Sequence, residues 1–257
     1  MSTFRTVALA AVRAAGAQLH RRFHRLTPSD IRRKGAHDIV TRADDEANTL
    51  IIRAIRKHFP GHQILSEETG RQGIASSYRW VVDPLDGTLN FTIGNPLFCT
   101  ALALVHGDQV ELGIIYAPAL GELYVAERGR GATCNGRRIR TSAVSRMRDA
   151  VVLIGRSHDV RSHRRSFLLQ ERLERRAMSG RQIGSDSLCF AFTAAGRVAA
   201  TVLVPPGISA WDAAAGTLLV QEAGGAVLNF RGRAWSPGDD GIIACTKKIQ
   251  RQLVASL

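Results

Sequence analysis

The sequence predicts a mixed α/β (α+β) protein made of two tightly joined halves. Strand-like segments dominate the chain before residue 147, and helices alternate with strands after it, without a detectable internal repeat. A hydrophobic content of 45% in 257 residues is typical of a folded chain with a sizeable core. We therefore expect two domains, residues 1–147 and 148–257, and exclude a disordered basic tail.

Two helices are expected first. Apolar residues recur at helical spacing between Val7 and Leu19, including Ala14, and no acid precedes Asp30. We interpret this as an amphipathic helix rather than an organelle transit peptide. A basic irregular stretch (21–34) and an extended segment (38–41) lead to a second helix. That helix runs from Asp44 to about His58, with acids in its first turn and bases in its last.

The next segment is rich in predicted β structure. Short buried strands are expected at 64–65 and 80–82, and a hairpin at 98–105 and 110–116. Another hairpin is expected around Asn135-Gly136. Residues 146–149 look like the boundary between the two halves.

The second half alternates helices and strands. Helices are expected at 162–176, 187–195 and 211–223, the last ending at Gly224-Gly225. Strands are expected at 150–154, 198–204, 226–230 and 241–245, followed by a short final helix.

The charge is strongly positive. Lys and Arg total 35 against 22 Asp and Glu, a net charge of +13, which suggests an anionic partner such as nucleic acid, an anionic membrane or a phosphorylated small molecule. No apolar run approaches the ~18 residues needed to cross a bilayer, so we expect no membrane span. The four cysteines form no CxxC pair, and we expect free thiols in a reducing cytoplasm.

The acids are placed unusually in this basic chain. Residues 80–91 read WVVDPLDGTLNF: an apolar strand delivers Asp83, a proline fixes the turn, and Asp86 and Gly87 open a short helix. Both carboxylates and the Leu85 carbonyl can converge on one Mg²⁺ or Ca²⁺. The Gly87 and Thr88 amides can hold an anion, and a metal beside an anion site suits phosphoryl transfer. A DPxDG surface turn is the alternative interpretation.

Three more acidic sites lie in apolar surroundings. Glu67 and Glu68 follow an apolar strand, Asp44 begins the second helix, and Asp212 begins an apolar helix. Each of them alone can be explained as a helix cap or a solvated side chain. Four such sites in one basic chain favour a common function.

These motifs resemble the inositol monophosphatase superfamily of Mg²⁺-dependent, lithium-sensitive phosphomonoesterases. The matching segments run in order along nearly the whole chain: DIVTRAD at 38–44, SEE at 66–68, WVVDPLDGTLNF at 80–91 and WDAAAGTLLVQEAGG at 211–225. The resemblance implies a layered αβαβα sandwich of the inositol monophosphatase and fructose-1,6-bisphosphatase type. It also implies two or three Mg²⁺ ions per subunit and a homodimer.

The resemblance also assigns site residues by position. It implies metal ligation by Glu67, Asp83, the Leu85 carbonyl, Asp86 and Asp212. Asp44 and Thr88 are implied to activate water, with Glu67 as a further catalytic residue. Gly87, Thr88, Ser185 and Asp212 are implied to bind substrate, and Lys34 aligns with a loop near the site.

Two departures concern the substrate. The branch specific for inositol phosphates often has a glutamate at the strand end that corresponds, without a gap, to Pro205. Its Gly-Thr-Ala stretch corresponds to Gly184-Ser185-Asp186. Inositol monophosphate is the leading expected substrate. Histidinol phosphate, fructose 1,6-bisphosphate and 3′-phosphoadenosine nucleotides remain alternatives, with specificity expected from Ser185, Asp186 and residues 204–209.

Other classes of function fit less well. Gly129 to Gly136 lacks the GxGxxG spacing of a nucleotide site and suits hairpin turns better. Aromatic residues make up 6%, and no RNP-like or KH-like motif is visible, so nucleic-acid binding through basic segments such as 137–140, 161–165 and 172–181 is expected only as a secondary activity. A scaffold without catalysis is disfavoured because every implied metal ligand is present.

Overall fold

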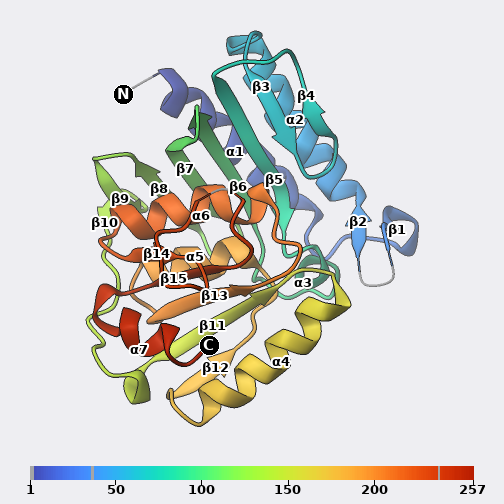
Figure 1. The fold of residues 1–257 in the computed structure, drawn as a ribbon. Helices are drawn as coiled ribbons and strands as arrows, with labels where there is room; N and C mark the ends of the chain where they lie inside the picture. Colours follow the sequence, from blue (N-terminus) through green and yellow to red (C-terminus); the bar gives the residue numbers. More distant parts are fainter. Residues whose placement is uncertain (1–2, 36–37, 237) are drawn as a thin grey trace.

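The computed structural model describes residues 3–35, 38–236 and 238–257, and within them helices and sheets form alternating layers (Figure 1). Helices α1 (Thr3–Arg22) and α2 (Arg42–His58) cover the outer face of an eight-stranded sheet. Helices α5 (Asp186–Ala194) and α6 (Ala210–Glu222) lie between this sheet and a five-stranded sheet. Helices α4 (Val160–Glu174) and α7 (Gln250–Val254) cover the far face. The predicted αβαβα sandwich is confirmed.

The large sheet has the strand order β10-β9-β8-β7-β6-β5-β3-β4. Within this sheet, β3 and β5 pair in parallel, and every other pair of neighbouring strands is antiparallel. The bounds are β3 Gln63–Ser66, β4 Gly70–Gln72, β5 Tyr78–Asp86, β6 Cys99–His106, β7 Gln109–Ala117, β8 Glu122–Glu127, β9 Gly131–Cys134 and β10 Arg137–Arg138.

Two smaller sheets contain the other strands of the described residues. The five-stranded sheet has the order β12-β11-β13-β15-β14, with β11 parallel to both of its neighbours. Its bounds are β11 Val151–Arg156, β12 Ser179–Arg181, β13 Ala200–Val204, β14 Ala226–Leu228 and β15 Ile242–Cys245. A two-stranded ribbon, β1 (Ile31–Arg33) with β2 (Ile39–Thr41), leads into α2.

Side chains alternate between two cores along each central strand, as the period of two requires. On β6, Ala101 and Ala103 face α5 and α6, whereas Leu102 and Leu104 face α1 and α2. On β13, Leu203 faces inward while Val202 faces α4 and α7. The inner core therefore contains residues from both halves of the chain, and neither half closes it alone.

Several sequence predictions need correction. The strand predicted at 80–82 continues through Pro84 to Asp86, because a register shift between Asp83 and Asp86 takes the proline out of the regular ladder. Ala14 was expected in the apolar face of α1 but is exposed. The polar strands β1, β4 and β12 were missed because three-residue strands carry no alternating pattern.

Gly113 on β7 is expected to be essential for the packing of α6 against the large sheet. A Cβ there would lie 2.6 Å from the Ala215 carbonyl oxygen, which is helix backbone and cannot rotate away. We expect Gly113→Ala to lower the free energy of unfolding in urea by about 1–3 kcal/mol, as in overpacked cores. Gly61→Ala is the control, because a Cβ at Gly61 meets nothing within 4 Å. Equal stabilities of the two variants would contradict the packing argument.

Candidate active site

Most of the predicted site residues line one cavity. It has a volume of about 800 Å³ and lies where the end of β5 meets the first turns of α3 (Thr88–Thr92), α5 and α6. It is lined from both halves of the chain. Of the predicted residues, the lining includes Lys34, Glu67, Asp83, Leu85, Asp86, Gly87, Thr88 and Asp212. Asp44 and Ser185 are buried behind this lining.

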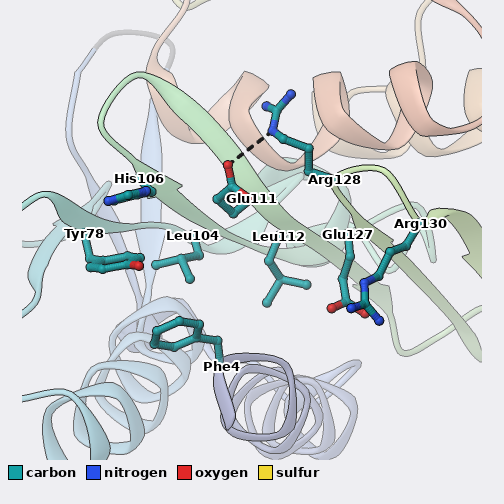
Figure 2. Close-up of a pocket in the computed structure, with 9 residues that line it drawn as sticks. All are labelled: Phe4, Tyr78, Leu104, His106, Glu111, Leu112, Glu127, Arg128 and Arg130. Atoms are coloured by element: carbon teal, nitrogen blue, oxygen red, sulfur yellow. Dashed lines mark ion pairs between the residues drawn. The ribbon is translucent and has the colours of Figure 1, made fainter. Parts of the chain in front are cut away.

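A second cavity is smaller and chemically different (Figure 2). It has a volume of about 220 Å³ and contains none of the predicted site residues. Its apolar side is formed by Phe4, Tyr78 and Leu112. The rim acid Glu111 already pairs with Arg128 at 3.3 Å. The larger cavity is therefore the candidate site.

Asp83 is a buried carboxylate at the end of β5. Its Oδ1 accepts a hydrogen bond from the Leu85 amide at 3.1 Å, and the side chain has no ion-pair partner among the described residues. Burial raises the pKa of Asp83 well above its usual value, and the charges of Glu67, Asp86 and Asp212 raise it further. Burial and repulsion therefore favour the protonated form of Asp83, and its ionised form would need a positive charge that the described residues do not supply as an ion-pair partner.

Asp86 joins the two halves of the chain. Its carboxylate accepts hydrogen bonds from the Ser185 hydroxyl at 2.9 Å and from the Asp186 and Ser187 amides at 3.2 and 2.5 Å. These donors form the N-terminus of α5, where a helix favours negative charge. Burial nevertheless raises the pKa of Asp86, although these hydrogen bonds act in the opposite direction. The Ser185 hydroxyl is thus engaged with protein atoms, and its role toward substrate stays a prediction.

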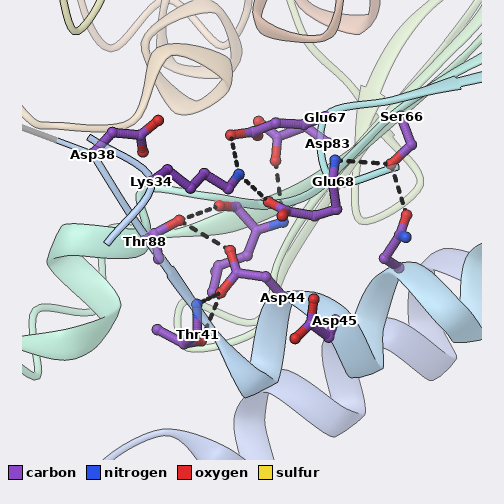
Figure 3. A network of polar contacts seen from close by, with 12 residues as sticks. Lys34, Asp38, Thr41, Asp44, Asp45, Ser66, Glu67, Glu68, Asp83 and Thr88 are labelled. Atoms are coloured by element: carbon purple, nitrogen blue, oxygen red, sulfur yellow. Dashed lines mark hydrogen bonds and ion pairs between the residues drawn. The ribbon is translucent and has the colours of Figure 1, made fainter. Parts of the chain in front are cut away.

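Asp44 and Thr88 form a connected pair (Figure 3). The Thr88 hydroxyl lies 3.1 Å from Asp44 Oδ1 and 3.0 Å from the Leu85 carbonyl oxygen. Asp44 Oδ2 accepts the amide and hydroxyl of Thr41 at 2.8 and 2.6 Å, which completes a capping box at the start of α2. Burial raises the pKa of Asp44 to about 7. Asp44 is therefore both a helix cap and a carboxylate able to exchange a proton near neutral pH.

Lys34 contacts two acids of the site (Figure 3). Its Nζ lies 3.3 Å from Glu67 and 2.7 Å from Glu68. Burial lowers the pKa of Lys34, but Glu68 and Glu67 outweigh this effect and raise it overall. Burial raises the pKa of both glutamates, and Lys34 opposes that shift. The neighbouring His37 lies outside the described residues.

Two further positions depend on local backbone geometry. Gly87 has φ 89°, and a Cβ there would lie 2.8 Å from the Leu97 carbonyl oxygen, so glycine is required before α3. Asp212, in the first turn of α6, accepts the Ser209 amide at 2.7 Å. Burial, with Asp86 and Glu67 adding to it, raises the pKa of Asp212 to about 8.

The donor set fits a hard divalent cation. Every candidate ligand is a carboxylate or carbonyl oxygen, as Mg²⁺ prefers, and the raised pKa values reflect charge that a cation would compensate. Among the described residues, however, no group of three His, Cys, Asp or Glu side chains is already arranged so that it could hold a metal ion. The Glu67 carboxylate instead contacts the Lys34 ammonium, and the Asp86 carboxylate accepts hydrogen bonds from the start of α5. The metal-ligand assignments therefore remain predictions.

Sequence reasoning missed part of the cavity wall. Arg33, Arg156, His163 and Gln182 line it, from segments far apart in the chain. Neither their spacing nor their residue types distinguish them from the many other basic and polar residues of the chain. Asp186 and Gly207 lie in the segments where substrate contacts were expected, and both line the cavity.

The metal-free protein is expected to lose stability as the pH rises. The pKa of Asp44 is raised from 3.8 to about 7, and that of Asp212 from 3.8 to about 8. From about pH 4 up to these raised values, the folded protein therefore binds more protons than the unfolded chain. The free energy of unfolding should therefore fall from about pH 5 to about pH 8, by at least about 1.4 kcal/mol, the equivalent of one pKa unit. Urea denaturation in EDTA measures it.

Two controls accompany this measurement. Asp212→Asn should flatten the slope while leaving His62, whose pKa burial lowers, to titrate as before. Saturating Mg²⁺ should stabilise the wild type more at about pH 8 than at about pH 5. A metal-free protein whose stability is constant or increases over this range would contradict the assignment of buried, uncompensated carboxylates.

Comparisons with known proteins identify the family of this chain. A sequence model of the Inositol monophosphatase family matches residues 1–257. An inositol-1-monophosphatase of Mesorhizobium japonicum is 39% identical over 258 residues, covering 100% of this chain and 96% of the relative. The Nus factor SuhB of Pseudomonas aeruginosa is 38% identical over 238 residues, covering 90% and 87%.

Solved structures also resemble this chain over nearly its whole length. The extragenic suppressor protein suhB of Bartonella henselae superposes with a TM-score of 0.93 at 34% identity, covering 99% of this chain and 98% of that one. Thermotoga maritima IMPase superposes with a TM-score of 0.90 at 35% identity, covering 99% and 96%. Fold, motifs and relatives thus agree, and the chain belongs to the inositol monophosphatase family of phosphoric monoester hydrolases.

Proposed function

We propose that the protein hydrolyses a small phosphomonoester with Mg²⁺, and that inositol monophosphate is its leading substrate. The observation that carries the proposal is the gathering of five buried or half-buried acids, four of them lining one cavity and the fifth, Asp44, bonded to the lining residue Thr88, in a chain with net charge +13. These acids are Asp44, Glu67, Asp83, Asp86 and Asp212. The positive surface elsewhere attracts an anionic substrate toward them.

Five groups would hold the metal. They are the carboxylates of Glu67, Asp83, Asp86 and Asp212 and the carbonyl oxygen of Leu85, sharing two or three Mg²⁺ ions. Mg²⁺ in such a site lowers the pKa of water and neutralises charge on the phosphate and the leaving oxygen. The Lys34 ammonium lies 3.3 Å from Glu67 Oε1, so a metal at Glu67 would either compete with Lys34 for this oxygen or use Oε2.

Asp44 and Thr88 would position and deprotonate the attacking water. A hydroxyl has one proton and two lone pairs, so a Thr88 hydroxyl that donates to ionised Asp44 keeps lone pairs free to accept from water. A base whose pKa lies near the working pH is well suited to this role, and the pKa of Asp44 is raised to about 7. Glu67, at the edge of the same cavity, completes the catalytic set.

The phosphate would lie against the start of α3. The Gly87 and Thr88 amides belong to its first turn, and the left-handed backbone of Gly87 sets their direction. Ser185 and Asp212 are proposed to complete the substrate contacts. In-line displacement puts the leaving alcohol on the side of the phosphorus opposite the water, which is the side away from Asp44 and Thr88.

The names of the relatives bear on the substrate. One relative is an inositol-1-monophosphatase, and others are Nus factor SuhB. Histidinol phosphate, fructose 1,6-bisphosphate and 3′-phosphoadenosine nucleotides remain alternatives for the same site. We also propose a lithium-sensitive, cytoplasmic homodimer; no helix in the described chain is long and apolar enough to span a membrane.

Replacing Asp83 tests the chemistry. We expect Asp83→Asn to lower kcat by at least about 1000-fold, because several kcal/mol of charge stabilisation depends on its position among the proposed ligands. The measurement is phosphate release from a panel of the four substrate types with Mg²⁺, with and without Li⁺. The fold should survive, because the change relieves repulsion from Glu67, Asp86 and Asp212.

Two variants serve as references. Asp108→Asn, in an exposed turn between β6 and β7, should keep full activity. Asp44→Asn should cost less than Asp83→Asn, about 100-fold or more, which is the range of general base catalysis. Near-normal Mg²⁺-dependent activity of Asp83→Asn, or no phosphate release by the wild type from any substrate, would contradict the proposal.

A further inference from the structure

The smaller cavity lies at the opposite end of strand β5 from the candidate active site (Figure 2). Tyr78, the first residue of β5, lines it, whereas Asp83 and Asp86, toward the other end of the strand, line the larger cavity. Its volume of about 220 Å³ exceeds that of the water-sized voids usual in protein interiors. The proposed phosphatase mechanism uses none of its lining residues, so a ligand held there is separate from that reaction.

The middle of this cavity is apolar. Leu104 on β6 and Leu112 on β7 are direct neighbours in the sheet, and Figure 2 shows the ring of Phe4 facing them from the start of α1. Both leucines are buried, whereas Phe4 is only half-buried. A ligand that covers these three side chains would therefore remove apolar surface from water, which favours binding.

Tyr78 forms an aromatic wall of fixed orientation. Its ring is stacked between His62, with centroids 4.9 Å apart and planes at 9°, and His106, at 4.3 Å and 14°. Because both faces of the ring are covered, Tyr78 presents its edge to the cavity. The edge of an aromatic ring carries partial positive charge and favours contact with the face of another ring. This wall therefore suits a flat aromatic ligand.

The charges around this cavity leave one cation for a ligand. The two acids that line it already have partners: Glu111 lies 3.3 Å from Arg128, and Glu127 lies 3.2 Å from Arg5. Arg130 also lines the cavity, across from the aromatic wall (Figure 2). Within the described part of the chain, its guanidinium makes no hydrogen bond or ion pair, so it is available to an anionic group.

We propose that this cavity binds a small aromatic carboxylate, with the ring against Phe4, Leu104 and Leu112 and the carboxylate at Arg130. A guanidinium suits a carboxylate because it can donate two parallel hydrogen bonds to it. The cavity has room for a single ring with a short acidic side chain. A cationic ligand would instead meet Arg130 and find both lining acids already paired. The site is independent of the proposed phosphatase function.

Four ligands of similar size test the proposal. Phenylacetate has both the ring and the charge, phenylacetamide lacks the charge, 2-phenylethylamine has the opposite charge, and cyclohexylacetate lacks the aromatic ring. The NMR signals of the Leu104 and Leu112 methyl groups, followed in the full chain with Mg²⁺, give both the affinity and the place of binding. We expect phenylacetate to bind with a Kd of about 0.1–1 mM, the amide and the amine at least about 10-fold more weakly, and cyclohexylacetate about 2- to 10-fold more weakly.

Two arginine variants separate the site from the general charge of the chain. Arg130→Gln should weaken phenylacetate binding about 10-fold, to near the level of phenylacetamide, because it removes the charge-assisted hydrogen bonds. It should leave the affinity for phenylacetamide unchanged. Arg137→Gln is the matched control, because Arg137 is exposed, lines neither cavity and loses the same charge. This control should bind both ligands as the wild type does.

The other outcomes would overturn the proposal. Equal weakening by Arg130→Gln and Arg137→Gln would reduce the binding to general attraction by a chain of net charge +13. Tighter binding of 2-phenylethylamine than of phenylacetate would make this a site for cations. Phenylacetate binding that leaves the Leu104 and Leu112 signals unchanged, or no binding at all, would remove the aromatic-acid site from this cavity. Each of these results would leave the proposed phosphatase function untouched, because none of them measures phosphate release.

Discussion

The structure depends on the burial of several carboxylates at one point between two sheets. Asp86 shows how this is tolerated: it accepts hydrogen bonds from two amides and a hydroxyl at the start of α5, so the end of strand β5 in the N-terminal half is held by a helix of the C-terminal half. Asp44 and Asp212 are stabilised in the same way at the starts of α2 and α6. Helix N-termini thus supply partial positive charge that side chains do not. Asp83 lacks such a helix.

This arrangement explains why the two halves share a core. The end of β5 must meet the start of α5 for Asp86 to find its donors, and α5 and α6 fill the space between the sheets. Close contacts enforce the geometry: Gly113 admits the backbone of Ala215, and Gly155 admits Asp186. The candidate site and the packing of the two sheets therefore depend on the same helices, and the site is built on strand and helix ends rather than on long loops.

Local chemistry made part of the fold and site predictable from sequence. The strand, proline turn and glycine of residues 80–91 act within a few residues of one another, and the confirmed family resemblance rests on them. Contacts between distant residues were not predictable: Asp86 meets Ser185 from 99 positions away, and Lys34 meets Glu67. The strand through Pro84 was missed because propensity rules end a strand at proline, whereas a register shift accommodates it.

The arginine excess has a partial structural explanation. Arg22 pairs with Glu46 and Arg175 with Glu171, while Arg176 donates to the Ala255 carbonyl and so helps to hold the C-terminal segment. Such exposed pairs contribute about 0–1 kcal/mol each, and most of the positive charge remains as a field around the acidic cavity. Secondary nucleic-acid binding through the basic segments stays a prediction.

Proton release on Mg²⁺ binding tests the central claim most directly. Because burial holds the pKa of Asp212 at about 8 in the metal-free protein, Mg²⁺ must displace protons from the site near neutral pH. Titration calorimetry at about pH 7 in two buffers of different ionisation enthalpy counts them. We expect release of about one proton or more per chain, and fewer from Asp212→Asn. Mg²⁺ binding without proton release, or no binding at all, would contradict it.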